Sequence, residues 1–239
     1  MIPISKAAKL LGVSIQTLRR WDKAGTLRPA YVSPGGHRYY AASALEQYTR
    51  NLWVQAHAWA ASTSPLPLTP DLYCQTSSIF QARLSSFETG LQRIPDLKAG
   101  ERFSLVVSMV GEIGDNAYAH NLGNWPDIPG VFFAADLNRR QVVVADRGLG
   151  VLITLRRVKP ELRDDAEALR VAFTETISAR APERRGNGLK YVRRLIATGS
   201  FHLRFQSGQD ELFLHAGSDA LDIHPAGTPI RGTIAFLTF

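Results

Sequence analysis

The sequence predicts two domains: a small helix-rich head, and a larger α+β sandwich with helices on one face of a mixed sheet. Three observations lead to this prediction. The chain has 239 residues, enough for two modest domains. A stretch with three prolines and little charge begins at Ser62 and separates the two parts. Before it the patterns are mainly helical, and after it two amphipathic helices precede a series of short apolar strands. We therefore place the domains at 1–61 and 73–239, with a linker at 62–72.

Bulk composition narrows the class of protein. Hydrophobic residues make up 45% of the chain, which is enough for a packed core. The single cysteine, Cys74, excludes an internal disulfide framework and a cysteine-based zinc site. The N-terminus does not have the pattern of a signal peptide, and no apolar run is long enough to span a bilayer. We expect a cytoplasmic protein without a membrane partner.

Positive charge is concentrated in the head. Residues 1–64 carry eight Lys or Arg and two acidic residues, so they hold +6 of the net charge of +7. A basic head on a near-neutral body favours contact with a polyanion, although a solvated charged surface would have the same composition.

Residues 4–25 read as two short helices around a tight turn. Gly12 can take the positive φ of a sharp helix exit, and Ser14 is a suitable N-cap for the second helix. Leu18 and Trp21 are three residues apart and would pack inward. The outer surface is then left to side chains that could read a DNA major groove, namely Gln16, Thr17, Arg19, Arg20 and Lys23.

A hairpin follows these helices. Two β-prone pieces flank Pro34-Gly35-Gly36, a sequence typical of a turn. Arg38 and Tyr39 come directly after it. A turn with a basic and aromatic stem can lie along DNA phosphates as a wing.

The stretch "AAKLLGVSIQTLRRWDKAGTLRPAYVSPGGHRYY" resembles the winged helix-turn-helix of the MerR family, and the similar head of certain transposon-encoded serine recombinases. The resemblance runs from about Ile4 to Tyr48. It implies that the second helix reads bases in double-stranded DNA and that the wing grips the backbone. The residues that would do so are Gln16, Thr17, Arg19 and Arg20 on the helix, and His37, Arg38 and Tyr39 on the wing. The alternative is that Arg19 or Arg20 only pairs with Asp22 or Glu46.

The stretch "SALEQYTRNLWVQAHAWAA", residues 43–61, follows the wing and has helical periodicity. MerR-like proteins usually dimerise through a long helix at this place, so the chain could form a homodimer. Packing onto the second domain is an equally good interpretation of this stretch.

The body begins with two amphipathic helices. The first has apolar residues at Phe80, Leu84, Phe87 and Leu91 and ends before Pro95, and the second runs from about Arg102 to Asn121. "VFFAAD" and "QVVVAD" read as buried strands joined by "LNRR", in which Asn138 suits a tight turn. A mixed loop and helix region covers 152–181. A helix then starts in "GNGLKYVRRLI", and "FHLRFQ", "ELFLHA" and "TIAFLTF" are strands.

One helical face in the body carries polar groups. Glu112, Asn116 and His120 are spaced by four residues, so they project from the same side of the second helix. An amide oxygen can join the shell of Mg²⁺, and a carboxylate one turn earlier can hold and deprotonate a water. Taken alone, this spacing is more typical of a solvated face.

Two glycine-containing motifs follow. In "ADRGLGV", Asp146 ends a strand and could accept a hydrogen bond from an exocyclic amine, while Gly148 and Gly150 let the backbone pass close to a flat ring. In "RRGNGLKYV", glycines precede a helix whose N-terminal amides could bind an anion. Each motif alone is also consistent with an ordinary turn or helix start.

In order and spacing these motifs resemble the three boxes of the GHKL ATPase superfamily, which includes gyrase, histidine kinases and bacterial anti-sigma kinases. The form E-x-x-x-N-A-x-x-H is most similar to the anti-sigma serine kinases, and the resemblance covers about Phe80 to Phe239. It implies a Bergerat-type fold that binds ATP and Mg²⁺. Glu112 would be the catalytic base and Asn116 the Mg²⁺ ligand, while His120 is as consistent with a structural role. The ATP contacts would come from Asp146 at adenine, from Gly148 and Gly150 at the base pocket, from Arg185, Gly186, Gly188 and Leu189 at the phosphates, and from Thr233 near the nucleotide. Residues 152–185 would form the lid.

The leading hypothesis is a DNA-binding transcription regulator whose GHKL-type domain binds ATP-Mg and switches DNA or partner binding, with slow hydrolysis through Glu112. One alternative is an anti-sigma-like serine/threonine kinase or switch that acts on a sigma-factor-related or co-encoded protein. Another is a DNA-targeted ATPase of a mobile element or defence system. No phosphoacceptor of the histidine-kinase type precedes the boxes, since His57 is followed by Ala58.

Overall fold

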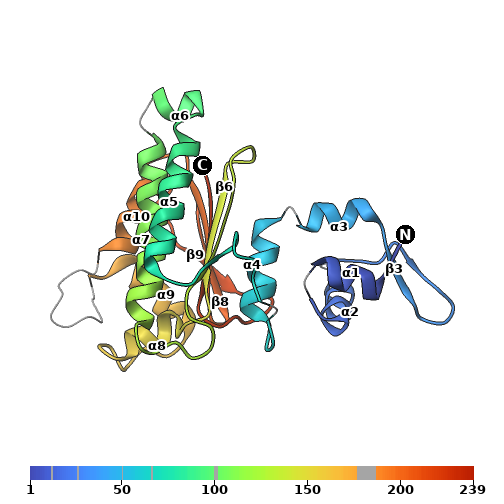
Figure 1. Ribbon diagram of the computed structural model, residues 1–239. Helices are drawn as coiled ribbons and strands as arrows, with labels where there is room; N and C mark the ends of the chain where they lie inside the picture. Colours follow the sequence, from blue (N-terminus) through green and yellow to red (C-terminus); the bar gives the residue numbers. More distant parts are fainter. Residues whose placement is uncertain (12, 26, 50, 66, 100–101, 177–186) are drawn as a thin grey trace. The chain divides into compact units, whose positions relative to one another are not determined.

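The computed structural model describes residues 1–239 apart from residues 12, 26, 50, 66, 100–101 and 177–186. The chain divides into two compact units, Met1–Pro67 and Leu68–Phe239. The division falls inside the proline-rich stretch. Figure 1 labels the helices and some of the strands of both units.

The N-terminal unit combines short helices with a small sheet. Its helices are α1 (Ile4–Leu11), α2 (Ile15–Ala24), α3 (Ala42–Thr49) and α4 (Leu52–Ala61). Its strands are β1 (Ile2–Pro3), β2 (Tyr31–Val32) and β3 (Arg38–Tyr40), in the order β1-β3-β2 with antiparallel pairing.

Local sequence signals account for this arrangement. Ser14 caps α2 by accepting a hydrogen bond from the Thr17 amide at 3.0 Å, as predicted. Gly25 ends the helix at φ 74°, in the left-handed region that favours glycine. The predicted turn between β2 and β3 is present, and Gly36 adopts φ 77° in it. The Gly12 prediction lies outside the described residues. The unit packs around a small core of Ala7, Ala8, Leu18, Leu27, Tyr40 and Leu45.

The stretch after the wing is two helices and not one. The helix α3 ends at Thr49, and α4 begins at Leu52. Asn51 starts the second helix because its side-chain oxygen accepts a hydrogen bond from the Val54 amide at 3.2 Å. The sequence suggested that this stretch forms one continuous dimerisation helix, and that prediction is wrong. The homodimer itself stays a prediction.

The C-terminal unit is an antiparallel α+β sandwich. Its helices are α5 (Ser77–Leu91), α6 (Pro95–Ala99), α7 (Arg102–Asn121), α8 (Gly150–Arg156), α9 (Asp165–Thr174) and α10 (Gly188–Thr198). Its strands are β4 (Tyr73–Cys74), β5 (Val131–Asp136), β6 (Gln141–Asp146), β7 (His202–Ser207), β8 (Asp210–Leu214), β9 (Asp222–Pro225) and β10 (Thr233–Thr238). They form one sheet in the order β4-β5-β6-β10-β7-β8-β9.

The prediction of a mixed sheet is wrong. All neighbouring strands in the described sheet pair antiparallel. The helical crossover from β6 to β7 would suit a parallel pair, but β10 lies between these two strands and pairs with both. The last strand of the chain thus removes the expected parallel contact.

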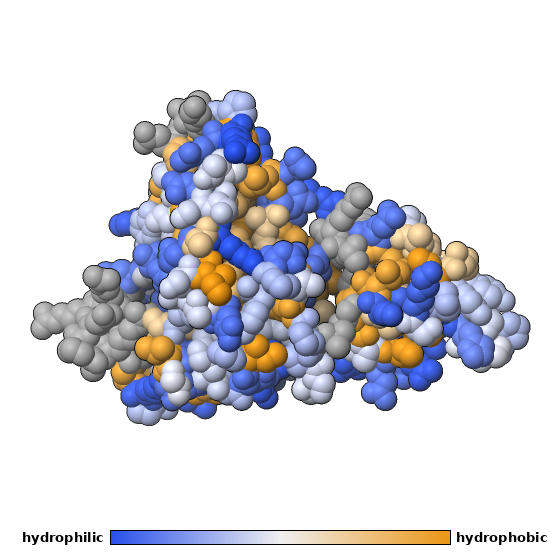
Figure 2. Space-filling model, viewed as in Figure 1, coloured by the Kyte–Doolittle hydropathy of each residue, from blue (hydrophilic) through white to orange (hydrophobic). Residues whose placement is uncertain are grey.

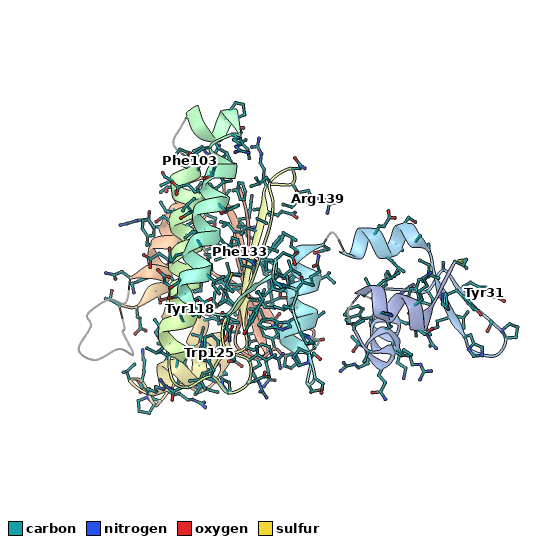
Figure 3. All side chains as sticks on the ribbon, in the orientation of Figure 1. Tyr31, Phe103, Tyr118, Trp125, Phe133 and Arg139 are labelled. Carbon is teal, nitrogen blue, oxygen red and sulfur yellow. The ribbon has the colours of Figure 1, made fainter. Side chains whose placement is uncertain are left out.

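One face of the sheet carries the main core. Figure 1 shows α5, α7 and α10 along this face, and buried side chains from both layers interlock there. Phe80 of α5 meets Phe133 of β5 edge-on, with ring centroids 5.7 Å apart. Figure 3 labels Phe133 and also Tyr118, whose hydroxyl donates to the Cys74 carbonyl oxygen at 2.6 Å. The buried stripe predicted for the second helix, Val106, Val110, Ile113 and Ala117, is confirmed.

The β5–β6 hairpin forms as predicted, but its turn residue differs. Arg140, and not Asn138, adopts a positive φ of 54°. Tertiary contacts hold Arg140 in place, because its guanidinium binds both carboxylate oxygens of Asp96 at 2.7 and 3.0 Å. Its carbonyl oxygen also accepts a hydrogen bond from the Phe239 amide at 3.0 Å. These contacts outweigh the local preference of Asn for this conformation.

Candidate functional site

The outer face of α2 presents donors to solvent. Gln16, Arg19 and Arg20 are exposed, whereas Leu18 on the opposite side is buried. Side chains at these positions can reach base edges when a helix enters a major groove. The structure therefore brings these three predicted residues onto one surface.

Thr17 has a different place. Its hydroxyl lies 2.9 Å from the Ser14 hydroxyl, and its amide donates to the same oxygen. Arg20 donates weakly to the Thr17 hydroxyl at 3.5 Å. Thr17 thus forms part of the N-terminal cap of α2, in addition to any contact with bases.

The wing is joined to α2 by an ion pair. Arg38 Nε lies 2.7 Å from Asp22 Oδ2, and the two side chains are 23% and 21% exposed. The sequence left open that Asp22 would pair with Arg19 or Arg20, and its partner is instead the wing arginine. His37 is exposed, and the Tyr39 ring lies 5.9 Å from that of Tyr31. Arg38 consequently fixes the position of the wing, while His37 faces solvent.

In the C-terminal unit a buried carboxylate lies at the end of β6. Asp146 is 2% exposed, and its Oδ1 accepts a hydrogen bond from the Gly148 amide at 2.7 Å. Its Oδ2 accepts from the Thr233 hydroxyl at 2.5 Å. Burial raises the pKa of Asp146 to about 6, against the opposite effect of these hydrogen bonds. The structure thus brings together Asp146, Gly148 and Thr233, which the sequence placed at one site.

Asn121 is a further member of this cluster that the sequence analysis missed. It is 3% exposed in the last turn of α7, and its Nδ2 lies 3.4 Å from Asp146 Oδ1. Its Oδ1 accepts a hydrogen bond from the Leu149 amide at 2.9 Å. A Cβ on Gly148 would lie 2.1 Å from Asn121 Nδ2, so this close approach requires glycine.

Gly150 and Gly232 flank the same cluster with left-handed backbone. Gly150 has φ 76° and Gly232 has φ 75°. A Cβ on Gly232 would lie 2.3 Å from the Asp146 carbonyl oxygen. The glycine in the terminal "GT" therefore lets Thr233 reach the carboxylate.

A cavity of about 820 Å³, here called the α7–α10 cavity, opens beside the predicted catalytic face. Its lining includes Glu112, Asp115, Asn116, Gly188, Lys190 and Arg194. A Cβ on Gly188 would lie 2.5 Å from Glu112 Oε2 and 3.4 Å from Asn116 Nδ2. The start of α10 therefore lies directly against the Glu112–Asn116 pair. The volume is within the range of small-molecule sites.

The remaining predicted residues are distributed differently. Leu189 packs against the hydrophobic core and does not line the cavity. Arg185 and Gly186 lie outside the described residues. His120 is half-buried in the last turn of α7 and is also absent from the cavity lining. The other lining residues were not predicted from the sequence, namely Ser108, Asp115, Thr176, Asn187, Lys190, Tyr191 and Arg194. Three of them, Lys190, Tyr191 and Arg194, follow Gly188 on the same amphipathic helix.

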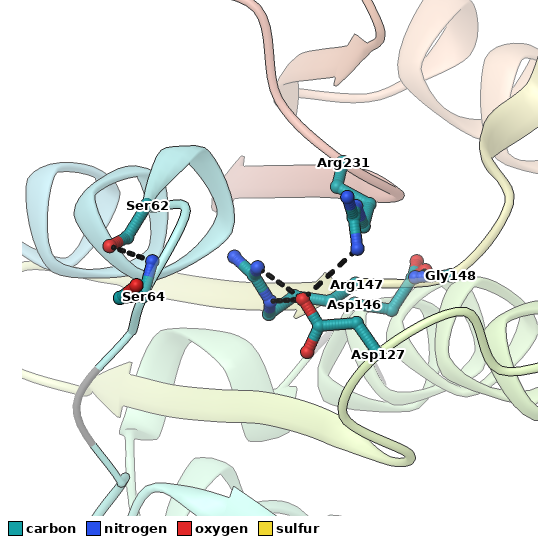
Figure 4. A network of polar contacts seen from close by, with 7 residues as sticks. All are labelled: Ser62, Ser64, Asp127, Asp146, Arg147, Gly148 and Arg231. Carbon is teal, nitrogen blue, oxygen red and sulfur yellow. Dashed lines mark hydrogen bonds and ion pairs between the residues drawn. The ribbon is translucent and has the colours of Figure 1, made fainter.

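A charged network lies next to Asp146. Arg147 is 2% exposed, and its Nε donates to Asp127 Oδ2 at 3.1 Å. Arg231 Nη1 donates to the same oxygen at 3.2 Å (Figure 4). Asp127 thus joins the loop before β5, the end of β6 and the segment before β10. We infer that this network fixes the backbone around the Asp146 cluster.

The two sites share one helix. Asn116 lines the α7–α10 cavity, and Asn121 bonds Asp146 five residues later. At 1.5 Å per residue these positions are roughly 7.5 Å apart along the helix axis. Asn121 and Asp146 themselves are buried and do not belong to the cavity lining.

These features define a protein with a winged helix-turn-helix unit and an antiparallel α+β sandwich that contains a buried carboxylate and a polar cavity. Residues 3–40 match the family model described as MerR family regulatory protein. A "Probable heavy metal-dependent transcriptional regulator" from Haemophilus influenzae is 39% identical over 59 residues, which cover 23% of this chain and 46% of that protein. The match therefore spans less than half of the relative's length. The N-terminal unit carries a MerR-family helix-turn-helix, which suggests a DNA-binding regulator.

The described residues hold neither a candidate membrane span nor a metal-binding cluster of side chains. None of the described helices is long and apolar enough to cross a membrane. On the face of the molecule that Figure 2 shows, hydrophilic and apolar side chains are mixed. Within the same residues, no group of three or more His, Cys, Asp or Glu is arranged to hold a metal ion.

Proposed function

We propose that this protein is a DNA-binding transcription regulator whose C-terminal unit is a GHKL-type domain that binds ATP-Mg and switches DNA or partner binding. The observation that carries the proposal is the Asp146 cluster and its connection through α7 to the Glu112–Asn116–Gly188 side of the cavity.

At the adenine end, Asp146 serves as the acceptor for an exocyclic amine. An ionised carboxylate offers about four acceptor positions. The Gly148 amide, the Thr233 hydroxyl and backbone amide, and the Asn121 side chain donate to these positions, so an exocyclic amine would share the one held by the long 3.4 Å contact from Asn121. The close packing of Gly148 and Gly232 around the carboxylate keeps its orientation fixed.

At the phosphate end, the N-terminus of α10 faces Glu112 and Asn116. A helix N-terminus stabilises an anion, and glycine at Gly188 lets the Glu112 carboxylate approach this helix start closely. The Asn116 amide oxygen would hold Mg²⁺, which suits an ion that keeps waters and phosphate oxygens as its other ligands. Once bound, the ion would offset phosphate charge. The side-chain oxygens of Glu112 and Asn116 at the cavity are of the kind that Mg²⁺ prefers, so the residues present fit this group.

Glu112 would set the lifetime of the bound state. Its side chain is exposed and lines the cavity, so it can accept the proton of a water directed at the terminal phosphate. Slow hydrolysis would then return the protein to its nucleotide-free state. The switch itself needs only that ATP binds one conformation better than the other.

Calorimetric titration of ATP with Mg²⁺ into the full chain tests the pocket. We expect binding by the wild-type protein and at least tenfold weaker binding by Asp146→Asn. Asp219→Asn is the matched control, because that carboxylate is 73% exposed in the same unit. Wild-type protein that is folded and binds no ATP would refute the pocket.

DNA affinity at fixed salt, measured with ATP, with ADP and without nucleotide, then tests the switch. Equal affinity in all three conditions would refute switching of DNA binding. Transfer of labelled phosphate to a protein partner in the same conditions would favour the kinase alternative.

A further inference from the structure

Arg194 of α10 is a cation in the lining of the α7–α10 cavity. Its side chain is exposed, and in the part of the chain that the structure describes it makes no ion pair or hydrogen bond. Its guanidinium lies over the Tyr191 ring, with Cζ 5.8 Å from the ring centroid. A cation–π contact of this kind orients a guanidinium without neutralising its charge. The N–H donors of Arg194 therefore remain available to a ligand.

The ring under this guanidinium is connected to the other helix of the cavity. Ser108 of α7 donates a hydrogen bond from its Oγ to the Tyr191 hydroxyl at 3.3 Å, and both residues line the cavity. Tyr191 is half-buried, so its ring has less freedom than an exposed side chain would have. An arginine that stacks on such a ring loses less conformational freedom when it binds a ligand.

The other charged groups of the lining do not take up the donors of Arg194. Glu112 and Asp115 of α7 line the same cavity, but neither carboxylate forms an ion pair with Arg194 in the described part of the chain. Asp115 Oδ1 instead accepts a hydrogen bond from Gln81 Nε2 at 2.8 Å. The second cation of the lining, Lys190, donates to a backbone carbonyl oxygen at 2.7 Å. Arg194 is thus the cation of this lining that is most free to bind an anion from outside the chain.

The chemistry of a guanidinium indicates the kind of anion. Its planar fork matches two oxygens of one phosphate, and charge-assisted hydrogen bonds of this type are roughly twice as strong as neutral ones. A chain of phosphates carries several such oxygens, and a cavity of about 820 Å³ is within the range of sites for small molecules. Mg²⁺ bound with the phosphates would offset their repulsion from Glu112 and Asp115.

We propose that Arg194, oriented by Tyr191, binds the phosphate chain of the ligand in the α7–α10 cavity. This inference rests on the proposed nucleotide site and adds to it a phosphate-binding residue outside the motifs that the sequence singled out. Arg194 is the binding residue, and Tyr191 is a positioning residue that acts through it. The shared chemistry is a polyphosphate, which either a nucleotide or an inorganic chain could supply.

The test is calorimetric titration of the full chain with ATP and with inorganic tripolyphosphate, both with Mg²⁺. We expect Arg194→Met to weaken the binding of both ligands by about tenfold. This is the lower end of the effect of a lost hydrogen bond to a charged group, because the side chain is exposed. Arg170→Met is the matched control, since it removes an exposed arginine of α9 that does not line the cavity. It should change both affinities by less than about twofold.

Two substitutions at Tyr191 test the positioning role. Tyr191→Leu removes the aromatic ring and should weaken tripolyphosphate binding by about two- to fivefold, as for a lost cation–π contact at an exposed site. Tyr191→Phe keeps the ring and should retain more of the affinity. Thermal melting checks that each variant is folded. Wild-type affinity in a folded Tyr191→Leu variant would overturn the role of Tyr191.

The outcomes separate this inference from the proposed function. Wild-type protein that binds neither ATP nor tripolyphosphate overturns both. ATP binding that is unchanged in Arg194→Met overturns only the role of Arg194, as does an equal loss of affinity in Arg170→Met. If tripolyphosphate binds as tightly as ATP and both need Arg194, the phosphate-binding role stands and the adenine pocket is refuted.

Discussion

The buried carboxylate of Asp146 should make the stability of the C-terminal unit depend on pH in a defined direction. The perturbation that isolates it is Asp146→Asn, which keeps the size of the side chain and removes its ionisation. The amide oxygen can still accept from Gly148, and the amide nitrogen can donate to the Thr233 hydroxyl. The variant therefore imitates the protonated form of the native residue.

The magnitude follows from the pKa of Asp146, which burial raises from 3.8 to about 6. The folded state then holds this proton more tightly than the unfolded state, so the contribution of the group is most favourable below the unfolded pKa. It is lost as pH rises through the folded pKa, and little changes above it. A difference of about 2 pH units corresponds to roughly 3 kcal/mol at 1.36 kcal/mol per unit.

The assay is urea unfolding of full-length wild type and Asp146→Asn at several pH values, followed by far-UV circular dichroism. Taking the difference between the two proteins cancels the titration of all other groups. The variant should gain about 3 kcal/mol relative to the wild type between pH 4 and pH 7, with most of the change from about pH 4 to 6. A difference that stays constant with pH to within about 1 kcal/mol would refute the reasoning, because the carboxylate would then have an ordinary pKa.

Three further predictions concern single positions. The Tyr40 side chain is fully buried, and its hydroxyl has no hydrogen-bond partner among the described residues, so Tyr40→Phe should leave the free energy of unfolding unchanged or raise it by up to about 1 kcal/mol. A loss of more than that in urea unfolding would indicate a partner for the hydroxyl. Gly188→Ala should retain the wild-type melting temperature, because the Glu112 side chain can move, yet bind ATP about tenfold more weakly in calorimetry, because the added Cβ displaces the Glu112 carboxylate from its place against the start of α10. ATP affinity equal to wild type would argue against phosphates at this place. Asp22→Asn should weaken binding to duplex DNA although it adds positive charge, since Arg38 loses the partner that holds the wing. Tighter binding in a salt titration would mean that Arg38 contacts phosphate and does not depend on Asp22.

Much of the fold could be predicted because its signals are local. An apolar stripe over 20 residues determines the bounds of α7. The bounds predicted from it, Arg102 and Asn121, agree with the structure. The cap at Ser14 and the hairpin between β5 and β6 are likewise determined by residues within a few positions of each other. The strands β4 and β9 were missed because segments of two and four residues carry no readable periodicity.

The parts that could not be predicted depend on contacts distant in sequence. Asp146 and Thr233 are 87 residues apart, and only the placement of β10 beside β6 brings them together. The same placement makes the sheet antiparallel. The partner of Asp22 could not be chosen from the sequence either, because Arg38 is 16 residues away across the wing. A charge pattern shows which groups need partners, but it does not identify the partners.

The register and the close packing of α7 determine the positions of both its polar face and its buried end. Residues four apart lie on nearly the same side, which puts Glu112 and Asn116 together at the cavity. Asn121 is five residues beyond Asn116, so it is turned well away from that side and enters the buried region next to Asp146. The helix can hold this orientation only if it approaches α5 closely, and a Cβ on Gly114 would lie 2.0 Å from the Phe80 ring. Gly114 therefore determines how deep α7 lies in the core, and with it the positions of both the buried acceptor and the polar face. A shift of α7 at this point would move the buried acceptor and the polar face together, and the proposed switch would depend on this coupling.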